Sequence, residues 1–311
     1  MLISVLGSYG AGNLGDEAIL LGIRKRFPDA KFVVFSHNPK QSSKLHPGIT
    51  ARPLLPAGIR SYLTQFLNGN LRTSLALLKK SDRILIGGGG IFYDSLFSHG
   101  RNPIKVWHAR VRLLKFMKFP FELYCVGISK LEKNASQLRM KLICELAEKI
   151  SVRDQLSKQY LQTLGVKDTI EVLADPAYEL QPPLKNAHEG TFQVGISLRA
   201  WPKIHQTFQQ VREELQQLAE QPDLQILLIP MSLGRDDDRK VLRKFQKSLP
   251  PKLQACCTML ACSTPEQALE IIGNLDLLIG MRLHALLFAK LTQVPSFPIY
   301  YDEKVQAVLN T

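Results

Sequence analysis

The chain has 311 residues, of which 45% are hydrophobic and 22% charged, so it is an ordinary globular sequence long enough for two domains with complete cores. Its formal net charge of +13 predicts attraction to polyanions such as nucleic acid, anionic lipid or phosphorylated substrates, although a generally basic surface would give the same charge. No apolar run approaches the roughly 20 residues of a membrane-spanning helix, and the five cysteines lack the CxxC spacing of a zinc or redox site, which together favour a reduced, cytoplasmic protein.

Apolar runs of strand length alternate with helical patterns through the first half of the chain. Strands are predicted at Leu2–Leu6, Lys31–Ser36, Arg83–Ile86, Glu122–Val126, Lys149–Val152 and Ile170–Leu173. Helices are predicted between them, for example at Asp16–Phe27, Ser136–Glu148 and Gln155–Leu164. This alternation is typical of a parallel sheet wrapped by crossover helices.

A segment rich in proline and polar residues, Asp175–Gly190, interrupts the pattern and is predicted to be a linker. Strands resume at Phe192–Ser197, Leu224–Ile229, Leu275–Ile279 and Ser296–Tyr300, with helices at Thr207–Glu220, Asp237–Ser248, Pro265–Ile272, Leu283–Leu291 and from Asp302. We therefore expect two doubly wound parallel-sheet α/β domains, residues 1–180 and 191–311, that face a cleft. The second domain is short, so we expect a further C-terminal segment.

A glycine-rich loop, Gly7–Gly15, follows the first predicted strand. Gly10 and Gly12 allow tight turns and close approach of the backbone to a substrate. Asn13 and Asp16 can cap the helix that starts there, and the acidic pair that Asp16 forms with the next residue suits the hydroxyl groups of a sugar. The spacing departs from GxGxxG, so a dinucleotide site is weakly supported, and a purely structural turn is the alternative.

Four consecutive glycines, Gly87–Gly90, follow the strand predicted at Arg83–Ile86. Each glycine costs backbone entropy, and packing gives no evident reason for four in a row. Close approach of backbone N–H groups to a substrate explains Gly88, Gly89 and Gly90 better, and Asp94 at the end of the loop is a candidate polar contact.

Two arginines lie one or two residues after predicted strands. Arg153 follows the strand at Lys149–Val152, and Arg199 follows the first strand of the second domain. Open α/β sheets bind ligands at the carboxyl ends of their strands, so both are candidates for contact with an anionic substrate. A local ion pair between Arg153 and Asp154 is the structural alternative.

The motif Gly280–His284 lies between a predicted buried strand and a predicted helix. An arginine and a histidine two residues apart at a helix N-terminus suit a phosphate or carboxylate. His284 can also transfer a proton near neutral pH. Arg282 and His284 are therefore candidate catalytic residues.

Two weaker features have ordinary alternatives. The stretch Arg110–Lys118 is a basic, amphipathic helix that could lie on an anionic membrane, although a solvated helix face is commoner. The triplet Asp236–Asp238 could hold a metal, but the polar start of a helix explains it better. No P-loop, zinc spacing, GxSxG or RNA-binding signature is present, so neither a metal nor nucleic acid is expected.

Taken in order, these motifs resemble the polysaccharide pyruvyl transferase family of the CsaB type. The resemblance is carried by Gly10–Leu20, Gly87–Gly90, Ser151–Asp154, Ala174–Ala177, Gly195–Arg199, Gly280–His284 and Tyr301–Val305. It implies a glycosyltransferase-B-like fold, phosphoenolpyruvate as donor and a saccharide acceptor that is often carried on a lipid diphosphate. The family's Arg-Leu-His motif matches Arg282, Leu283 and His284. A further family arginine fits Arg153 best by spacing, with Arg199 as its rival.

We therefore expect a pyruvyl transferase of cell-surface polysaccharide biosynthesis that forms a pyruvyl ketal, with the acceptor on the first domain and the donor on the second. Arg282 with Arg153 or Arg199 would bind the donor's phosphate and carboxylate, His284 would transfer the proton, and Asp16 and Asp94 would contact acceptor hydroxyls. No metal or redox cofactor is needed. The acceptor and an anionic membrane at the inner face are the expected partners.

Two other functions stay open at this stage. One is a nucleotide-sugar-dependent glycosyltransferase on the same scaffold, because a fold does not decide a reaction. The other is a non-enzymatic binder of anionic polysaccharide or membrane. The sequence does not indicate the acceptor sugar, the ketal linkage or the oligomeric state.

Overall fold

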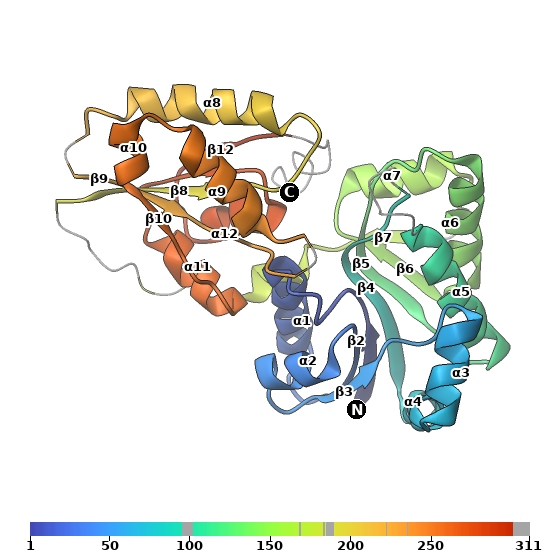
Figure 1. Cartoon of the computed structure of the whole chain (residues 1–311). Helices are drawn as coiled ribbons and strands as arrows, with labels where there is room; N and C mark the ends of the chain where they lie inside the picture. The colour runs from blue at the N-terminus through green and yellow to red at the C-terminus, as the bar shows by residue number, and fades with distance from the viewer. Residues whose placement is uncertain are drawn as a thin grey trace. The chain divides into compact units, whose positions relative to one another are not determined.

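The computed structural model describes residues 1–94, 102–167, 169–182, 184, 190–221, 223–234 and 236–300, and the chain divides into two compact units (Figure 1). The first unit contains Met1–Ala11 and Ile19–Pro176, whereas the second contains Gly12–Ala18 and Ala177–Leu309. The division at residue 176 falls inside the stretch that its proline and polar content marked as a linker. The helix expected from Asp302 lies outside the described residues.

Seven parallel strands form the sheet of the first unit, in the order β3-β2-β1-β4-β5-β6-β7. The strands are β1 (Leu2–Leu6), β2 (Lys31–Ser36), β3 (Thr50–Pro53), β4 (Arg83–Phe92), β5 (Glu122–Ile128), β6 (Lys149–Val152) and β7 (Ile170–Val172). The helices are α1 (Leu14–Arg26), α2 (Pro39–Leu45), α3 (Ile59–Leu67), α4 (Asn70–Lys80), α5 (Pro103–Phe116), α6 (Asn134–Leu146) and α7 (Gln155–Thr163). The first turn of α1 belongs to the second unit by its contacts.

Five parallel strands form the second sheet, in the order β10-β9-β8-β11-β12. They are β8 (Phe192–Ser197), β9 (Leu224–Leu228), β10 (Cys257–Met259), β11 (Leu277–Gly280) and β12 (Ser296–Pro298). The helices are α8 (Ile204–Gln217), α9 (Asp238–Ser248), α10 (Pro251–Ala255), α11 (Pro265–Gly273) and α12 (Leu283–Leu291), and a 3₁₀ turn occupies Pro176–Glu179.

Each sheet reverses its strand order beside its first strand, between β1 and β4 in the first unit and between β8 and β11 in the second. Successive connections leave such a point toward opposite faces of the sheet, and ligands of α/β proteins bind at the carboxyl ends of the strands there. The segments that leave these ends begin at Gly7 in the first unit and at Leu198 and Met281 in the second. The fold therefore brings the predicted motifs to the ligand-binding edge of each sheet.

The predicted strands are all present, with ends displaced by a few residues, whereas β3 and β10 were not predicted. Both are short strands at the edge of a sheet, and their residues are half-buried or exposed. The inner strands were predictable because helices cover both faces of a parallel sheet, so those strands are apolar runs. Edge strands need no such run, and their sequences resemble loops.

The stretch predicted as a basic, amphipathic helix, Arg110–Lys118, begins in α5, and its first arginine is buried. Arg110 points inward from α5, where its Nε donates to the Leu55 carbonyl at 2.9 Å and its guanidinium lies 4.8 Å from the Trp107 ring centroid. Burial lowers the pKa of Arg110 to about 10. Arg110, the first residue of this stretch, is thus part of the domain interior. None of the helices in the described part of the chain combines the length and apolar character that a bilayer crossing requires.

Candidate functional site

The first turn of α1 docks through its backbone onto the loop after β9. The Leu14 N–H donates to the Met231 carbonyl at 2.9 Å, and the Leu233 N–H donates to the Gly12 carbonyl at 2.8 Å. Gly12 has a φ of 80°, and a Cβ there would lie 2.7 Å from the Gly234 nitrogen. Gly12 is therefore required both for its left-handed backbone and for its close approach to the neighbouring loop.

His284 lies against this same turn of α1. It is the second residue of α12, after the N-cap Arg282 and the buried Leu283. A Cβ on Gly15 would overlap its imidazole ring, since Nδ1, Cγ and Cε1 all lie within 2.9 Å of that position. Asn13 accepts the Gly15 N–H at 3.0 Å and so fixes the backbone there. The absence of a side chain at Gly15 makes room for the imidazole.

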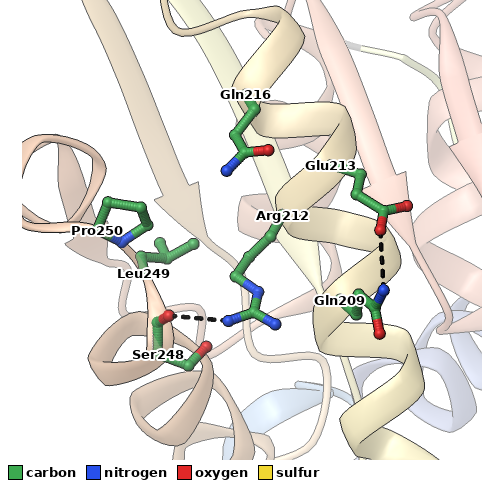
Figure 2. Close-up of a pocket in the computed structure, with 7 residues that line it drawn as sticks. All are labelled: Gln209, Arg212, Glu213, Gln216, Ser248, Leu249 and Pro250. Atoms are coloured by element: carbon green, nitrogen blue, oxygen red, sulfur yellow. Dashed lines mark hydrogen bonds between the residues drawn. The ribbon is translucent and has the colours of Figure 1, made fainter.

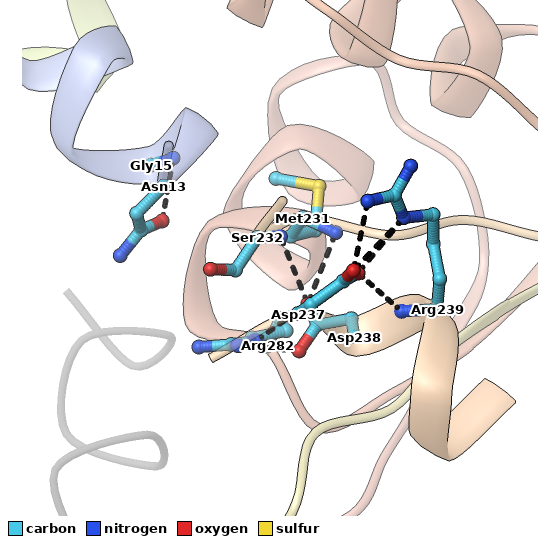
Figure 3. Close-up of polar contacts among 8 residues, drawn as sticks. All are labelled: Asn13, Gly15, Met231, Ser232, Asp237, Asp238, Arg239 and Arg282. Carbon is cyan, nitrogen blue, oxygen red and sulfur yellow. Dashed lines mark hydrogen bonds and ion pairs between the residues drawn. The ribbon is translucent and has the colours of Figure 1, made fainter. Parts of the chain in front are cut away.

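Arg282 is held in the second unit by a buried ion pair with Asp238, the first residue of α9 (Figure 3). Its Nε donates to Asp238 Oδ2 at 3.0 Å, and its Nη2 donates to Oδ1. Asp238 Oδ2 also accepts the N–H groups of Met231 at 3.1 Å and Ser232 at 2.9 Å. Burial raises the pKa of Asp238, and the Arg282 guanidinium opposes that shift. The carboxylate thus sets the plane of the guanidinium.

Arg199 lies at the same edge of the second sheet. It follows β8 by two residues, as Arg282 follows β11, and these two strands are neighbours. The Met281 N–H donates to the Ser197 carbonyl at 2.8 Å, which keeps the two strand ends together. Like Arg282, Arg199 opposes the upward shift that burial gives the pKa of Asp238, so the two arginines share one electrostatic environment. Positive charge therefore gathers at the reversal point of this sheet.

The aspartate triplet contributes to this arrangement through Asp237 and Asp238. Asp237 is the N-cap of α9, where it accepts the Arg239 N–H at 3.0 Å and pairs with the Arg239 side chain (Figure 3). That pairing lowers the pKa of Asp237. Across the described ranges, no cluster of three or more His, Cys, Asp or Glu side chains has a metal-binding arrangement.

Gly10 belongs to the first unit and packs against the start of α2. Its φ is 69°, and a Cβ there would lie 2.8 Å from both the Asn38 nitrogen and Ser42 Oγ. Its position requires glycine for steric reasons within the unit.

The run Gly87–Gly90 is part of β4 rather than a loop after it, which corrects the expected strand end at Ile86. A Cβ on Gly87 would lie 2.7 Å from the Tyr124 carbonyl oxygen, and one on Gly88 would overlap Ile19. Close packing within the unit thus explains two of the glycines, contrary to the expectation that packing gives no reason for them. Gly89 also has a positive φ, of 94°. Gly90 is exposed, and its nearest neighbour would be 3.9 Å away.

Asp94 is buried and holds the segment before α6. Its Oδ1 accepts the Glu132 N–H at 3.1 Å, and its Oδ2 accepts the Lys133 N–H at 2.9 Å. These contacts give Asp94 a structural role that its sequence position did not indicate.

Arg153 is also buried in the first unit, at 3% exposure. Its Nη1 donates to Asp175 Oδ2 at 3.0 Å, and its side chain packs on Gly127, where a Cβ would lie 2.5 Å from Nε. The local pair with Asp154, which was the structural alternative, is also present, at 3.9 Å from Nε to Oδ2, and Asp154 caps α7 by accepting the Ser157 N–H. Of the two rival arginines, Arg199 follows a strand of the same sheet as Arg282, and Arg153 follows a strand of the other sheet.

A model of the polysaccharide pyruvyl transferase family matches residues 13–303. The chain belongs to the polysaccharide pyruvyl transferase family. This match confirms the resemblance drawn from the motifs. A search of curated protein sequences found no match.

Solved structures of UDP-GlcNAc 2-epimerases share the fold of this pyruvyl transferase family member. The enzyme from Neisseria meningitidis bound to UDP-GlcNAc aligns with a TM-score of 0.59 and 12% identity over 99% of this chain and 89% of that one. The Methanocaldococcus jannaschii enzyme aligns with a TM-score of 0.59 and 14% sequence identity, over 100% of this chain and 92% of that one. S. aureus MnaA with UDP aligns with a TM-score of 0.60 and 12% sequence identity, over 99% of this chain and 86% of that one. At these identities the likeness shows the fold alone. That fold is glycosyltransferase-B-like, which the family resemblance predicted.

A pocket of about 410 Å³ lies elsewhere on the second unit of this family member (Figure 2). It is lined by Gln209, Arg212, Glu213, Gln216, Ser248, Leu249 and Pro250. Helix α9 begins near the carboxyl ends of the strands. Its last residue, Ser248, therefore lies toward the amino ends of the strands. The pocket contains none of the residues of the predicted site.

Sequence reasoning did not single out Gly15 or Asp238 as site residues. Gly15 was noted only as part of the glycine loop, and Asp238 only as part of a polar helix start. The one available signal was that each lies in a short motif after a strand, which does not indicate a contact with a segment far along the chain.

Proposed function

We propose that this protein transfers pyruvate from phosphoenolpyruvate to two hydroxyl groups of one sugar, forming a pyruvyl ketal and releasing phosphate. The proposal rests on one observation: His284, Arg282 and Arg199 gather at the reversal point of the second sheet, next to the first turn of α1. Family membership supports the same reaction class.

The reaction requires a proton, two cationic contacts and two hydroxyl groups. His284 donates a proton to the methylene carbon of phosphoenolpyruvate, which leaves an oxocarbenium-like centre at C2. One sugar hydroxyl attacks C2 and the C–O bond to phosphate breaks; a second hydroxyl then closes the ketal. Of the two protons that the hydroxyl groups release, one restores the His284 imidazolium and the other leaves with phosphate. The net change is a group transfer without oxidation, so it needs no redox cofactor.

The two arginines take different parts in this proposal. Arg282, with its guanidinium plane set by Asp238, offers directional N–H donors to the phosphate or carboxylate of the donor. Arg199 supplies a second positive charge from the adjacent strand end. Such preorganised charge stabilises the negative charge on the departing phosphate. Arg153 is paired with Asp175 in the first unit. In this proposal it stabilises that unit and does not contact the donor.

The acceptor side involves the glycine loop and Asp16. Asp16 follows Gly15 in the first turn of α1 and is half-buried, so it is our candidate for a sugar hydroxyl. The acceptor is a saccharide, and the family resemblance favours one carried on a lipid diphosphate. In that case the reaction takes place at the cytoplasmic face of a membrane.

The test is to incubate the purified protein with phosphoenolpyruvate and a panel of glycosyl acceptors, and to follow phosphate release and the mass of the acceptor. We expect acceptor-dependent phosphate release, and a loss of about 10²–10⁴ in kcat/KM for His284→Ala. His205→Ala, which removes an exposed histidine of α8 in the same unit, is the matched control and should retain full activity.

Two outcomes would replace this function with another. Turnover of UDP-GlcNAc or another nucleotide sugar without use of phosphoenolpyruvate would identify a nucleotide-sugar enzyme. Binding of anionic polysaccharide without turnover of either donor would identify a binding protein.

A further inference from the structure

The amphipathic helix α3 has the opposite orientation to that of an ordinary surface helix. Its apolar residues recur at helical spacing, and all are exposed: Ile59 84%, Tyr62 45%, Leu63 53%, Phe66 64% and Leu67 82%. At 100° per residue these side chains span an arc of about 140°. A helix that packs on a domain normally turns this face toward the core.

The polar face of α3 is the one that is attached to the first unit. Gln65 Nε2 donates to the Leu54 carbonyl at 2.9 Å, and Ser61 Oγ donates to the Gly58 carbonyl at 2.8 Å while accepting the Ala57 N–H. No residue of α3 is buried. The Ser61 bonds close the start of the helix, and the Gln65 bond joins its polar side to the unit while the apolar arc stays exposed.

The segment of the chain around this apolar arc is basic. From Ala30 to Ser81, which includes α2, α3 and α4, the chain contains no aspartate or glutamate, whereas lysine and arginine recur throughout. Arg60 on α3 and Arg72, Lys79 and Lys80 on α4 are exposed, and α4 lies next to α3 in the first unit (Figure 1). Arg60 adjoins the edge of the apolar arc, where a long side chain can extend toward lipid headgroups.

We propose that α3 is a membrane-docking helix, which inserts the side chains of Ile59, Leu63, Phe66 and Leu67 into the headgroup region of an anionic bilayer. An exposed apolar helical face with basic flanks is the pattern of helices that lie in the interface plane. The exposed basic residues of α3 and α4 bind the anionic headgroups at the same time.

Charge favours a bilayer over a second copy of this chain. A two-fold dimer would place the patch against itself, so the same basic residues would face one another across the interface. An anionic lipid surface neutralises them instead. The inference uses none of the residues of the predicted site, and it is independent of the proposed reaction.

The experiment measures binding of the full chain, without substrates, to vesicles of phosphatidylcholine alone and of phosphatidylcholine with phosphatidylglycerol. We expect binding that needs the anionic lipid and falls as salt rises, since charges are screened over about 10 Å at moderate ionic strength. Leu63→Gln with Phe66→Gln is expected to lower the partition coefficient at least about tenfold. Arg60→Gln with Arg72→Gln should lower it by about fivefold per residue.

Matched controls distinguish insertion of α3 from nonspecific adsorption of exposed apolar side chains. Leu138→Gln with Leu156→Gln removes two exposed leucines, 59% and 40%, from α6 and α7 of the same unit and should leave binding unchanged. Phe66→Trp should show quenching of tryptophan fluorescence by brominated lipid above the background of Trp107 and Trp201, whereas Leu138→Trp should not. Urea unfolding of each variant checks that the fold is retained.

Three results would overturn the inference. Absence of wild-type binding to anionic vesicles at low salt would show that the protein does not dock on such a membrane. Equal binding by wild type and the Leu63→Gln, Phe66→Gln variant, or no quenching at Phe66→Trp, would show that α3 does not insert. A wild-type dimer that this variant converts to a monomer, with vesicle binding unchanged, would assign the face to a second copy of the chain.

Discussion

The contact between Gly15 and His284 provides a direct test of the candidate site. A Cβ on Gly15 would lie within 2.9 Å of three imidazole ring atoms, whereas ordinary contacts are 3.4–4 Å, so Gly15→Ala has to displace the ring. A misplacement of about 1 Å in an active site can lower the rate about 10²-fold. We therefore expect kcat/KM for phosphate release to fall by about 10², although no catalytic group has been removed.

Stability should respond in a different way. Alanine is favoured over glycine by about 1 kcal/mol within a helix, and Gly15 is the second residue of α1. This gain partly offsets the cost of moving His284, so the free energy of unfolding should change by less than about 1 kcal/mol. Urea unfolding of the variant measures this. Gly58→Ala is the matched control for activity, because its Cβ would have nothing within 4 Å and it should leave kcat/KM unchanged.

A double variant decides whether Gly15 acts through His284. If it does, Gly15→Ala combined with His284→Ala should be no less active than His284→Ala alone, because the displaced group is already absent. A further loss equal to that of Gly15→Ala alone would refute the reasoning. So would wild-type activity of the single Gly15→Ala variant.

Three further predictions concern stability and reactivity. Asp238→Asn should lower the free energy of unfolding by about 3–5 kcal/mol in urea, because it leaves Arg282 buried without its ionic partner; a loss below about 1 kcal/mol would contradict this. Gly88→Ala should cost about 1–3 kcal/mol through overpacking and its φ of 75°, whereas Gly90→Ala should leave the thermal midpoint unchanged. Burial raises the pKa of Cys125 to about 11, so only roughly 0.1% is thiolate at about pH 8. Its alkylation by iodoacetamide, followed by peptide mass spectrometry, should therefore rise about tenfold per pH unit from there to about pH 10, and rapid labelling at the lower pH would contradict the burial.

The alternation of strands and helices was predictable from the sequence because the inner strands of both sheets are buried on two faces. Val33 to Phe35 in β2 and Ile226 to Leu228 in β9 lie in such positions and form apolar runs. The edge strands β3 and β10 were missed, since they are partly exposed and need no such run. The outward apolar face of α3 was missed as well, because a helical pattern does not indicate which face meets the domain.

The glycine run shows how far a local pattern can be interpreted. The sequence indicated that four consecutive glycines at Gly87–Gly90 are unusual. In the structure, Gly87, Gly88 and Gly89 have positive φ angles. The cause of the run, however, lies partly in Tyr124 and Ile19, which come from other elements and leave no room for a side chain at Gly87 and Gly88. A steric requirement of this kind depends on neighbours that only the folded chain supplies.

By itself, the sequence determined the two-unit α/β fold, the family and the short motifs that end at Arg199 and His284, because each of these depends on residues close together in the chain. The tertiary structure alone decided which side chains meet. Arg282 and Asp238 are separated by 44 positions, and the whole second unit must fold before the carboxylate can orient the guanidinium. Likewise, Gly15 comes from the N-terminal part of the chain and makes room for a histidine near its other end. Periodicity along the chain reports which face of an element is buried, whereas packing between distant segments decides which partner covers it.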